Sequence, residues 1–461
     1  MSSSSVQDIL SGLGRFGIHP GLDRIRAVLG FLGNPEKGPF IFQIVGTNGK
    51  GSTAAAIDAI LREAGYRTGR YTSPHLSDVR ERIMISGKPV PTSLFEFLVR
   101  EVDTLCRRHQ LDLTFFEFLT AVGLLAFSQS GCQVLVLEAG LGGRWDATTA
   151  VSPHLTVLTQ VERDHEEILG EGIANIFEEK VAVGKAGIPF VATLSEPSLR
   201  ERFLERRRKA GYIPVLNGRD FEGAWTSPDN INGEPRPFHY VGRWGERDLS
   251  SSLSATYQID NLSGSVAALE WSPLPISPRS IREGLLGVQN PGRLEMIRTS
   301  PRVILDGAHN PSAVKALCRA LRDRFGESED FGFFLGIHSV KDWKAMIQTL
   351  FLDGKAFFFP DVPKHSKSTL PADGSWVSPD QMAQMLRTLG KPGNDPVEIR
   401  DGGREALFQE ALAWANAGSH RTLVVTGSLY LVGYLRSFLV PTPDPPLFSL
   451  NERDLPGPDH S

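Results

Sequence analysis

The sequence FIFQIVGTNGKGST, residues 40–53, combines an apolar run, a glycine-rich turn and the start of a helix-compatible segment. This order predicts a strand, a turn and a helix. Such a turn directs backbone N–H groups and the positive end of the helix dipole toward one point. Lys50 adds a positive charge there, and Ser52 or Thr53 adds a hydroxyl for a metal ion. We therefore predict a phosphate-binding loop with a triphosphate as its occupant.

The loop departs from the usual pattern G-x-x-x-x-G-K-[ST] at two positions. Ile44 stands where the first glycine is expected, and Gly51 separates the lysine from the hydroxyl. The alternative interpretation is a glycine turn that only closes a βα unit. We favour a shortened phosphate loop, because GKGST keeps lysine and hydroxyls in the phosphate-loop order.

Composition limits the classes of protein to consider. At 461 residues the chain is long enough for two domains and a tail. A net charge of −4 gives no electrostatic footprint for nucleic acid or an anionic membrane, so we expect small-molecule partners. Three scattered cysteines indicate a reducing compartment, with Cys132 and Cys318 in cores. No apolar stretch approaches a bilayer span, and we expect a cytoplasmic protein.

Alternating strands and helices predict an open α/β sheet in the first half. After a helical lead-in over residues 6–32, a short strand is predicted at 68–71 and a further strand at 82–86. Apolar strands are predicted at 134–137 and 155–158. Polar residues follow three of these strands, namely Ser73, Glu138 and His165. Because ligands of such sheets bind beyond the carboxyl ends of the strands, we expect these side chains to converge.

The second half repeats the pattern after an irregular region. Residues 217–254 are rich in Gly, Pro, Asn and Trp, which indicates loops or a small β appendage. A second α/β block starts near residue 302. The sequence thus predicts an α/β protein: an N-terminal phosphate-loop ATPase domain with a mostly parallel sheet (1–286), a linker (287–300), a smaller Rossmann-like C-terminal domain (301–440) and a disordered tail (441–461).

A set of motifs occurs in a fixed order along the chain. They read SGLGRFGIHPGLDRI, GTNGKGST, TSPHL, RERIMISG, FFEFLTA, EAGLGGRWDAT, DHEEILG, PGRLE, LDGAHNP and VVTGSLYLVG. In this order the chain resembles the folylpolyglutamate synthases and dihydrofolate synthases of the Mur ligase superfamily, from roughly residue 10 to residue 435. The resemblance implies an ATP- and Mg²⁺-dependent amide ligase. It phosphorylates a pterin substrate's carboxylate, and glutamate's amine then attacks the acyl phosphate.

The resemblance assigns roles in phosphate and metal binding. The implied phosphate-loop residues are Gly46, Thr47, Asn48, Gly49, Lys50, Gly51, Ser52 and Thr53. The implied metal ligands are Ser52, Ser73, Glu138 and His165, for two Mg²⁺ ions, with a monovalent cation left open. Structural alternatives are a turn cap for Ser73, an exposed carboxylate for Glu138 and a helix cap for His165.

The family also carries a lysine carboxylated on its ε-nitrogen, which becomes a metal-binding carbamate. Two frames fit its pattern E-K-A-G-I-I-K. One places the modified residue at Lys185, followed by AGI, and the other places it at Lys180, after Glu178-Glu179. The second frame needs no gap from Asp164-His165, so we choose N6-carboxylysine at Lys180. For either residue the alternative is a solvated helix lysine.

Further roles carry over to the nucleotide and to glutamate. Gln258 and Asn261 correspond to adenine-contacting amides, although Tyr257 replaces the family's histidine, and Arg293 in PGRLE corresponds to a phosphate contact. Asp306 and His309 would position glutamate or the nucleotide, and Ser428 would contact glutamate. The implied catalytic residues are Lys50, Lys180, Asp306 and His309, with Asp306 also binding ATP. The alternative for LDGAHNP is a strand-end turn held by Asp306 and Asn310.

The implied pterin wall is apolar and aromatic, which suits a stacked ring. It contains Ser73, Pro74, His75, Arg82 and Phe116. Departures from the family are Arg80 for Asn, Thr149 for the Asn of D-A-T-N, Asn290 for Trp, and Lys341-Asp342 in a D-K-D loop that lacks its first Asp. They leave substrate choice open.

Three alternative functions stay open beside the leading one. They are a dihydrofolate synthase only, a Mur-type cell-wall ligase and an inactive nucleotide-binding relative. TSPHL and PGRLE favour the folate branch over the cell-wall branch, and the retained Lys50, Glu138, His165, Lys180 and His309 argue against inactivity. We expect a monomer acting on ATP, L-glutamate and folate or dihydropteroate, with two domains that close during the cycle.

Overall fold

The computed structural model describes residues 5–13, 21–231, 233–361, 376–389 and 397–440. The predicted tail, 441–461, lies outside the described residues. The chain divides into two compact units. The first comprises the chain up to residue 74 with 80–228 and 234–290, and the second comprises 75–79, 229–233 and the chain from 291 onward.

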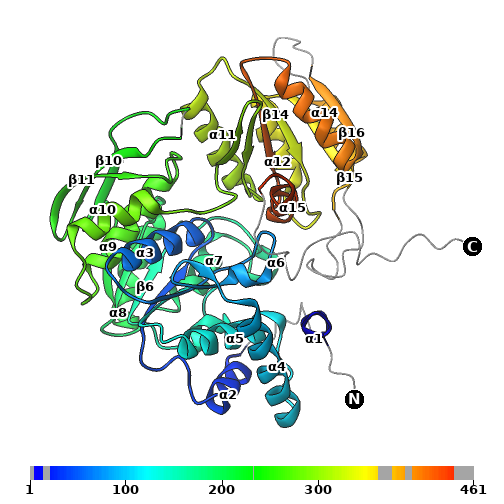
Figure 1. Ribbon diagram of the computed structural model, residues 1–461. Helices are drawn as coiled ribbons and strands as arrows, with labels where there is room; N and C mark the ends of the chain where they lie inside the picture. The colour runs from blue at the N-terminus through cyan, green and yellow to red at the C-terminus, as the bar shows by residue number, and fades with distance from the viewer. Residues whose placement is uncertain (1–4, 14–20, 232, 362–375, 390–396, 441–461) are drawn as a thin grey trace, which may run out of the picture. The chain divides into compact units, whose positions relative to one another are not determined.

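Within the described residues, the first unit contains an eight-stranded sheet (Figure 1). Its strands are β1 (Phe40–Val45), β2 (Thr68–Tyr71), β3 (Ile83–Ile85), β4 (Lys88–Pro89), β5 (Val134–Glu138), β6 (Leu155–Leu158), β7 (Pro189–Ala192) and β8 (Ile213–Leu216). The order is β4-β3-β2-β5-β1-β6-β7-β8, and only the β2–β3 and β3–β4 pairs are antiparallel. The mostly parallel sheet predicted from the apolar runs is confirmed, and its central strands β1, β5 and β6 are almost wholly buried.

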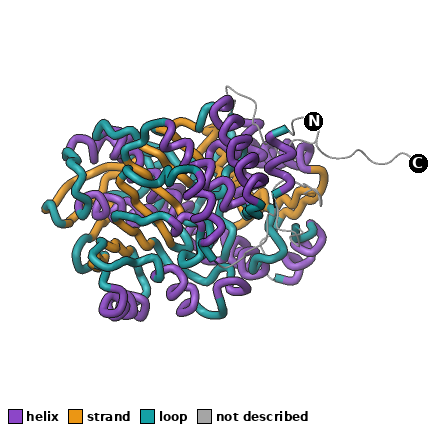
Figure 2. The backbone as a smooth tube through the Cα atoms, turned by 90° about the horizontal axis from the view of Figure 1, so that it is seen from below, coloured by secondary structure: helices purple, strands orange, loops and turns teal. Residues whose placement is uncertain are grey.

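Helices connect most of these strands, and Figure 2 distinguishes the helices and strands of the backbone by colour. Those between residues 6 and 287 are α1 (Val6–Gly12), α2 (Asp23–Phe31), α3 (Lys50–Glu63), α4 (Thr92–His109), α5 (Phe115–Gln129), α6 (Glu166–Leu169), α7 (Ile173–Val181), α8 (Pro197–Ala210), α9 (Gln258–Glu270) and α10 (Pro278–Gly287), with 3₁₀ turns η1 (Val79–Arg82) and η2 (Ala147–Ala150). The lead-in predicted over 6–32 is thus two helices, with residues 14–20 outside the described chain. The strand predicted at 82–86 is shorter, because Arg82 belongs to η1.

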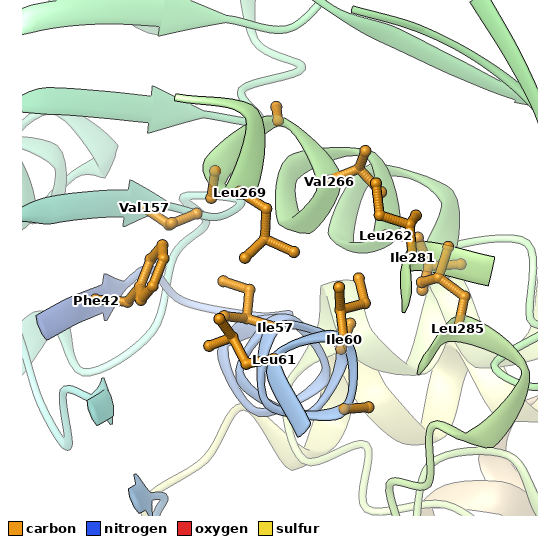
Figure 3. Packing of buried hydrophobic residues seen from close by; sticks show 14 of the residues in the cluster. Phe42, Ile57, Ile60, Leu61, Val157, Leu262, Val266, Leu269, Ile281 and Leu285 are labelled. Carbon is orange, nitrogen blue, oxygen red and sulfur yellow. The ribbon is translucent and has the colours of Figure 1, made fainter. Parts of the chain in front are cut away.

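Helix α3 is buried against the sheet and against α9 and α10. In Figure 3 its apolar side chains meet residues from both helices and from β1 and β6; the labelled residues are Phe42, Ile57, Ile60, Leu61, Val157, Leu262, Val266, Leu269, Ile281 and Leu285. A Cβ at Gly284 would lie 2.5 Å from the Cα of Ile60, so only glycine allows α10 to approach this closely. This packing fixes the helix whose first turn forms the predicted phosphate loop.

A three-stranded antiparallel sheet follows in the region predicted to hold loops or a β appendage. Its strands are β9 (Glu222–Trp225), β10 (Arg236–Gly242) and β11 (Gly245–Ser251), in the order β11-β10-β9. Buried Glu270 of α9 accepts hydrogen bonds from the Tyr240 hydroxyl at 2.9 Å and from the backbone N–H of Arg243 at 2.7 Å. Of the two alternatives for this region, loops or a small β appendage, the structure shows the small β appendage.

Among its described residues, the second unit contains a six-stranded sheet in the order β12-β13-β17-β14-β15-β16. Its elements are β12 (Glu295–Thr299), β13 (Arg302–Leu305), α11 (Pro311–Phe325), β14 (Asp330–Leu335), α12 (Trp343–Asp353), β15 (Gly354–Asp361), α13 (Pro379–Thr388), β16 (Glu398–Gly403), α14 (Arg404–Asn416), β17 (Arg421–Thr426) and α15 (Leu429–Leu439). All pairs except β12–β13 are parallel. The predicted Rossmann-like α/β architecture is confirmed, and β12 falls within the segment predicted to be a linker.

No helix in the ranges that the structure describes combines the length and the apolarity needed to cross a membrane. All three cysteines are buried, including Cys132 and Cys318 as predicted.

Candidate functional site

The turn between β1 and α3 requires glycine at two positions. Gly46 and Gly49 have φ of 151° and 93°. A Cβ at Gly46 would lie 1.8 Å from the hydroxyl of Thr159, and one at Gly49 would lie 2.1 Å from Oδ1 of Asn261. The turn then leads into the N-terminus of α3 at Lys50, where the first backbone N–H groups have no partner within the helix. This is the geometry of an anion-binding loop.

Two lysines donate to the same backbone oxygen in this turn. Nζ of Lys50 lies 3.1 Å from the carbonyl oxygens of Gly46 and Thr47, and Nζ of Lys180 lies 2.8 Å from that of Gly46. Lys180 is 3% exposed, so the solvated-lysine alternative is wrong for this residue. Burial, followed by the charge of Lys50, lowers the pKa of Lys180 to about 7. Lys185 instead donates to the carbonyl of Val151 at 3.2 Å, away from the turn.

The hydroxyl of Ser52 is surrounded by side-chain amides. It accepts hydrogen bonds from Nε2 of Gln258 at 3.1 Å and from Nδ2 of Asn290 at 2.9 Å. Asn261 in turn donates to Oε1 of Gln258 at 2.8 Å. Gln258 and Asn261, predicted to contact adenine, therefore pack directly on the phosphate loop, and Asn290 joins them. The hydroxyl of Thr53 is buried and has no hydrogen-bond partner among the described residues.

Glu138 is buried at the end of β5, so the exposed-carboxylate alternative is wrong. Its Oε2 accepts from the backbone N–H of Ser73 at 3.2 Å, and a Cβ at Gly51 would lie 3.6 Å from the same oxygen. Glu138, Ser73 and the phosphate loop are thus neighbours, as the convergence of strand ends predicted. A buried carboxylate offers oxygen atoms of the kind that Mg²⁺ prefers.

His165 lies at the start of α6 with a positive φ of 55°. Its Nδ1 is 3.5 Å from Oε1 of Glu167, and its Nε2 is 3.8 Å from Oδ1 of Asp164. Its side chain makes no capping hydrogen bond in α6. Within the described ranges, no three His, Cys, Asp or Glu side chains are grouped closely enough to hold a metal ion. Ser52 and Glu138 carry hydroxyl and carboxylate oxygens, the donor type that Mg²⁺ prefers, and phosphate and water oxygens commonly supply the remaining ligands of such sites.

Two residues without a predicted role hold the loops of this site. Glu162 pairs with Asn48, and its backbone N–H donates to Oγ1 of Thr47 at 3.1 Å. Asp146 accepts from the backbone N–H groups of Gly140 at 2.8 Å and Leu141 at 3.0 Å, which orders the segment after Glu138. In the sequence, the one indication of their role was that Asp146 follows strand β5 and Glu162 follows strand β6.

Replacing Asp146 by alanine is expected to destabilise the protein by about 2–4 kcal/mol, because one buried and two partly buried backbone donors lose their acceptor. Oδ1 of Asp146 also accepts from the backbone N–H of Thr148 at 2.9 Å. Burial raises the pKa of the Asp146 carboxyl, and these donors oppose that rise. Urea unfolding measures the change. The matched control is Asp112→Ala at an exposed position, and equal midpoints for the two variants would contradict the assigned role.

The predicted pterin wall groups several aromatic rings near Arg82. The guanidinium of buried Arg82 lies 5.4 Å from the centroid of the Phe115 ring. Tyr71 and Phe116 have ring centroids 5.8 Å apart, and a Cβ at Gly140 would lie 2.7 Å from the Phe116 ring. Of the remaining wall residues, Ser73 and Pro74 belong to the first unit, whereas buried His75 groups with the second.

In the second unit, three turns at the carboxyl edge of the sheet are joined by backbone hydrogen bonds. The N–H of Asp306 donates to Val425 at 3.0 Å, that of Gly427 to Ala308 at 3.0 Å, and that of Gly336 to Thr426 at 3.4 Å. These turns carry the predicted glutamate-side residues at one edge of the sheet.

The turn after β13, in the LDGAHNP motif, is the strand-end turn held by Asp306 and Asn310 that was the structural alternative for this motif. Oδ1 of Asp306 accepts from Ala308 N at 2.9 Å, and Oδ2 accepts from Leu294 N at 2.8 Å. Asn310 caps α11 by accepting from Ala313 N at 2.8 Å. Asp306 and Asn310 therefore hold this turn, whatever further role Asp306 has.

The other predicted residues of this unit lie around the same turns. Nδ1 of His309 is 2.9 Å from the carbonyl of Gly307, and a Cβ at Gly307 would lie 3.5 Å from Nη1 of Arg293. Oγ of Ser428 caps α15 by accepting from Tyr430 N at 3.2 Å.

Two family models match the chain. The Mur ligase middle domain matches residues 44–269, and the C-terminal domain of dihydrofolate synthetase matches residues 294–438. The dihydrofolate synthase/folylpolyglutamate synthase of Bacillus subtilis is 33% identical over 436 residues, which is 92% of this chain and 96% of that protein.

Solved structures agree with these matches. Escherichia coli FolC in complex with DHPP and ADP has a TM-score of 0.82 at 27% identity, over 95% of this chain and 98% of that chain. A bifunctional folylpolyglutamate synthase/dihydrofolate synthase with Mn, AMPPNP and L-glutamate bound has a TM-score of 0.80 at 27% identity, with the same coverage.

Proposed function

Because this chain belongs to the folylpolyglutamate synthase/dihydrofolate synthase family of Mur ligases, we propose that it is an ATP-dependent ligase that adds L-glutamate to a folate. The substrates would be tetrahydrofolate and its polyglutamates. The observation that carries this proposal is the cluster of the phosphate loop with Lys50, Ser52 and buried Glu138 in one unit. Related proteins have been solved with ADP, AMPPNP and glutamate, which supports the same substrates here.

The proposed reaction has two steps. An oxygen of the folate carboxylate attacks the γ-phosphorus of ATP, and ADP leaves. The uncharged amine of glutamate then attacks the acyl carbon, an amide bond forms, phosphate leaves, and the amine gives up a proton. In the first step two anions must meet, so positive charge and backbone donors are needed at the phosphate. Lys50 and the N-terminus of α3 supply them at the same turn.

A divalent cation belongs to this proposal, because a related structure contains Mn with AMPPNP. Ser52 and Glu138 would hold it through oxygen atoms, with Ser73 and His165 as the further proposed donors. The ion neutralises phosphate charge when bound. Mg²⁺ is the proposed ion, because Ser52, Ser73 and Glu138 offer hard oxygen atoms and phosphate oxygens complete such sites. Two such sites are proposed, as the resemblance implies.

We further propose that Lys180 is carboxylated on Nζ. A protonated lysine has no lone pair for a metal or for CO₂, so the neutral amine is required. The contact of Lys180 with Gly46 in the phosphate turn supports this residue over Lys185, which donates to Val151 instead. Burial lowers the pKa of both lysines, that of Lys180 to about 7. The carbamate would turn a second cation beside Lys50 into an anion.

The remaining sequence-derived roles stay proposals. Glutamate would bind at the joined turns of the second unit, where His309 and Ser428 lie. The pterin would stack near Arg82 and Phe116. The domain boundaries derived from the sequence, and closure of the two domains, are also proposals.

Dihydropteroate is a second candidate acceptor, because the Bacillus subtilis relative is named for both activities. The test is ADP formation by the purified chain with ATP and Mg²⁺, in parallel with tetrahydrofolate or dihydropteroate, each with and without L-glutamate. Mass spectrometry of the products identifies the acceptor and the number of glutamates added. We expect product formation that needs acceptor and glutamate together. ADP release that neither substrate affects would contradict the proposed function.

A further inference from the structure

The Ser52 hydroxyl is engaged on both of its acceptor positions. A serine hydroxyl offers two lone pairs and one proton. Gln258 donates to the oxygen at 3.1 Å, and Asn290 donates to it at 2.9 Å. A cation binds a hydroxyl through a lone pair, so Ser52 becomes a ligand only when one amide withdraws.

The side-chain amides of Gln258 and Asn290 differ in how strongly their surroundings constrain them. Gln258 is 1% exposed within α9, and its Oε1 accepts from Asn261 at 2.8 Å. The oxygen of Asn261 in turn lies against Gly49. Asn290 is only partly buried and follows the end of α10 in a segment that is neither helix nor strand. Moving Gln258 would disturb a buried chain of contacts, so Asn290 is the amide that can withdraw.

Asn290 also lies close to the proposed cation site. A Cβ at Gly51 would lie 3.6 Å from Oε2 of Glu138 and 4.0 Å from Nδ2 of Asn290. The carboxylate and the amide thus meet the phosphate loop at the same residue.

We propose that Asn290 is a positioning residue that competes with the divalent cation for Ser52. The inference rests on the proposed function. Binding of the cation with the nucleotide breaks the Asn290–Ser52 hydrogen bond, while the Gln258–Ser52 bond holds the hydroxyl in place. Asn290 is the last residue of the first unit, and both partners of this hydrogen bond belong to that unit.

The experiment is calorimetric titration of ADP into the wild-type chain and Asn290→Ala, once in Mg²⁺ and once in EDTA. Removing the competing amide is expected to tighten ADP binding in Mg²⁺ about two- to tenfold, the range for one hydrogen bond. Binding in EDTA is expected to stay unchanged. Asn416→Ala, at an exposed position of α14, is the matched control.

A double-mutant cycle with Ser52→Ala locates the effect. In the Ser52→Ala background, Asn290→Ala is expected to change nothing, because the shared hydroxyl is gone. Thermal unfolding of each variant confirms that it is folded.

Each other outcome overturns the inference. Weaker ADP binding by Asn290→Ala in Mg²⁺ would mean that Asn290 contacts the nucleotide. An equal change in Mg²⁺ and EDTA, or one that persists without the Ser52 hydroxyl, would mean a packing role. If the wild type binds ADP and Asn290→Ala binds it with the same affinity as the wild type in Mg²⁺ and in EDTA, only the proposed competition is overturned. Absence of any ADP binding by the wild type overturns the proposed function as well.

Discussion

Replacing Lys50 by alanine is expected to lower turnover at least about 100-fold, the effect of losing one preorganised charge or donor at a reacting phosphate. The ammonium donates to the carbonyls of Gly46 and Thr47, at the turn where the triphosphate is proposed to bind. Alanine keeps the start of α3 helical but removes the charge that brings two anions together. Coupled measurement of ADP formation, with folate and glutamate saturating, tests this expectation.

The control for Lys50→Ala is Lys209→Ala, which removes an exposed lysine of α8 and should leave turnover unchanged. Because the charge of Lys50 contributes to the lowered pKa of Lys180, the variant should also raise the pKa of Lys180. Wild-type turnover in Lys50→Ala would mean that the phosphate site lies elsewhere in the chain.

The strands that the sequence predicted best are those buried on both faces. Strand β5 and nearly all of β1 are buried, and each was visible as a largely apolar run, interrupted only by Gln43 in β1 and ended by Glu138 in β5. Strands β7 and β8 were not predicted, since each has four residues and includes a proline. Strands β12 and β16 are edge strands of the second sheet, with charged and exposed residues. They owe their pairing to a neighbouring strand, which local composition does not reveal.

The residues of the candidate site also fall into two groups, those that the local sequence could predict and those that depend on contacts distant in the sequence. The phosphate loop was predictable because its glycines, lysine and hydroxyls are consecutive. The roles of Asn290 and Glu162 were not, because their partners Ser52 and Asn48 lie more than a hundred residues away in the sequence. Burial of Glu138 and Lys180 also depends on the assembled sheet, so the sequence left exposed alternatives open for both.

Lys180→Ala is expected to lower turnover by at least about 100-fold, comparable to the loss of another preorganised charge in the site. A carbamate forms when neutral Nζ attacks CO₂: an N–C bond forms and a proton leaves. The pKa of Lys180 is lowered to about 7, so the neutral fraction rises as the pH increases through that value. Carboxylation limited by this proton should therefore increase from about pH 6 to about pH 8, whereas an ordinary lysine, with a pKa near 10.4, would stay almost fully charged.

The measurement is ¹³C NMR of the purified chain in ¹³C-bicarbonate across this pH range, with ADP formation recorded on the same samples. Lys185→Ala is the matched control, because that lysine is also partly buried but donates to Val151 and not to the phosphate turn. The carbamate signal should persist in Lys185→Ala and vanish in Lys180→Ala. The reverse pattern would move the modification to Lys185. A wild-type chain that is active but shows no signal at any pH would mean that Lys180 acts as an amine, and its contact with Gly46 would then serve only to shape the loop.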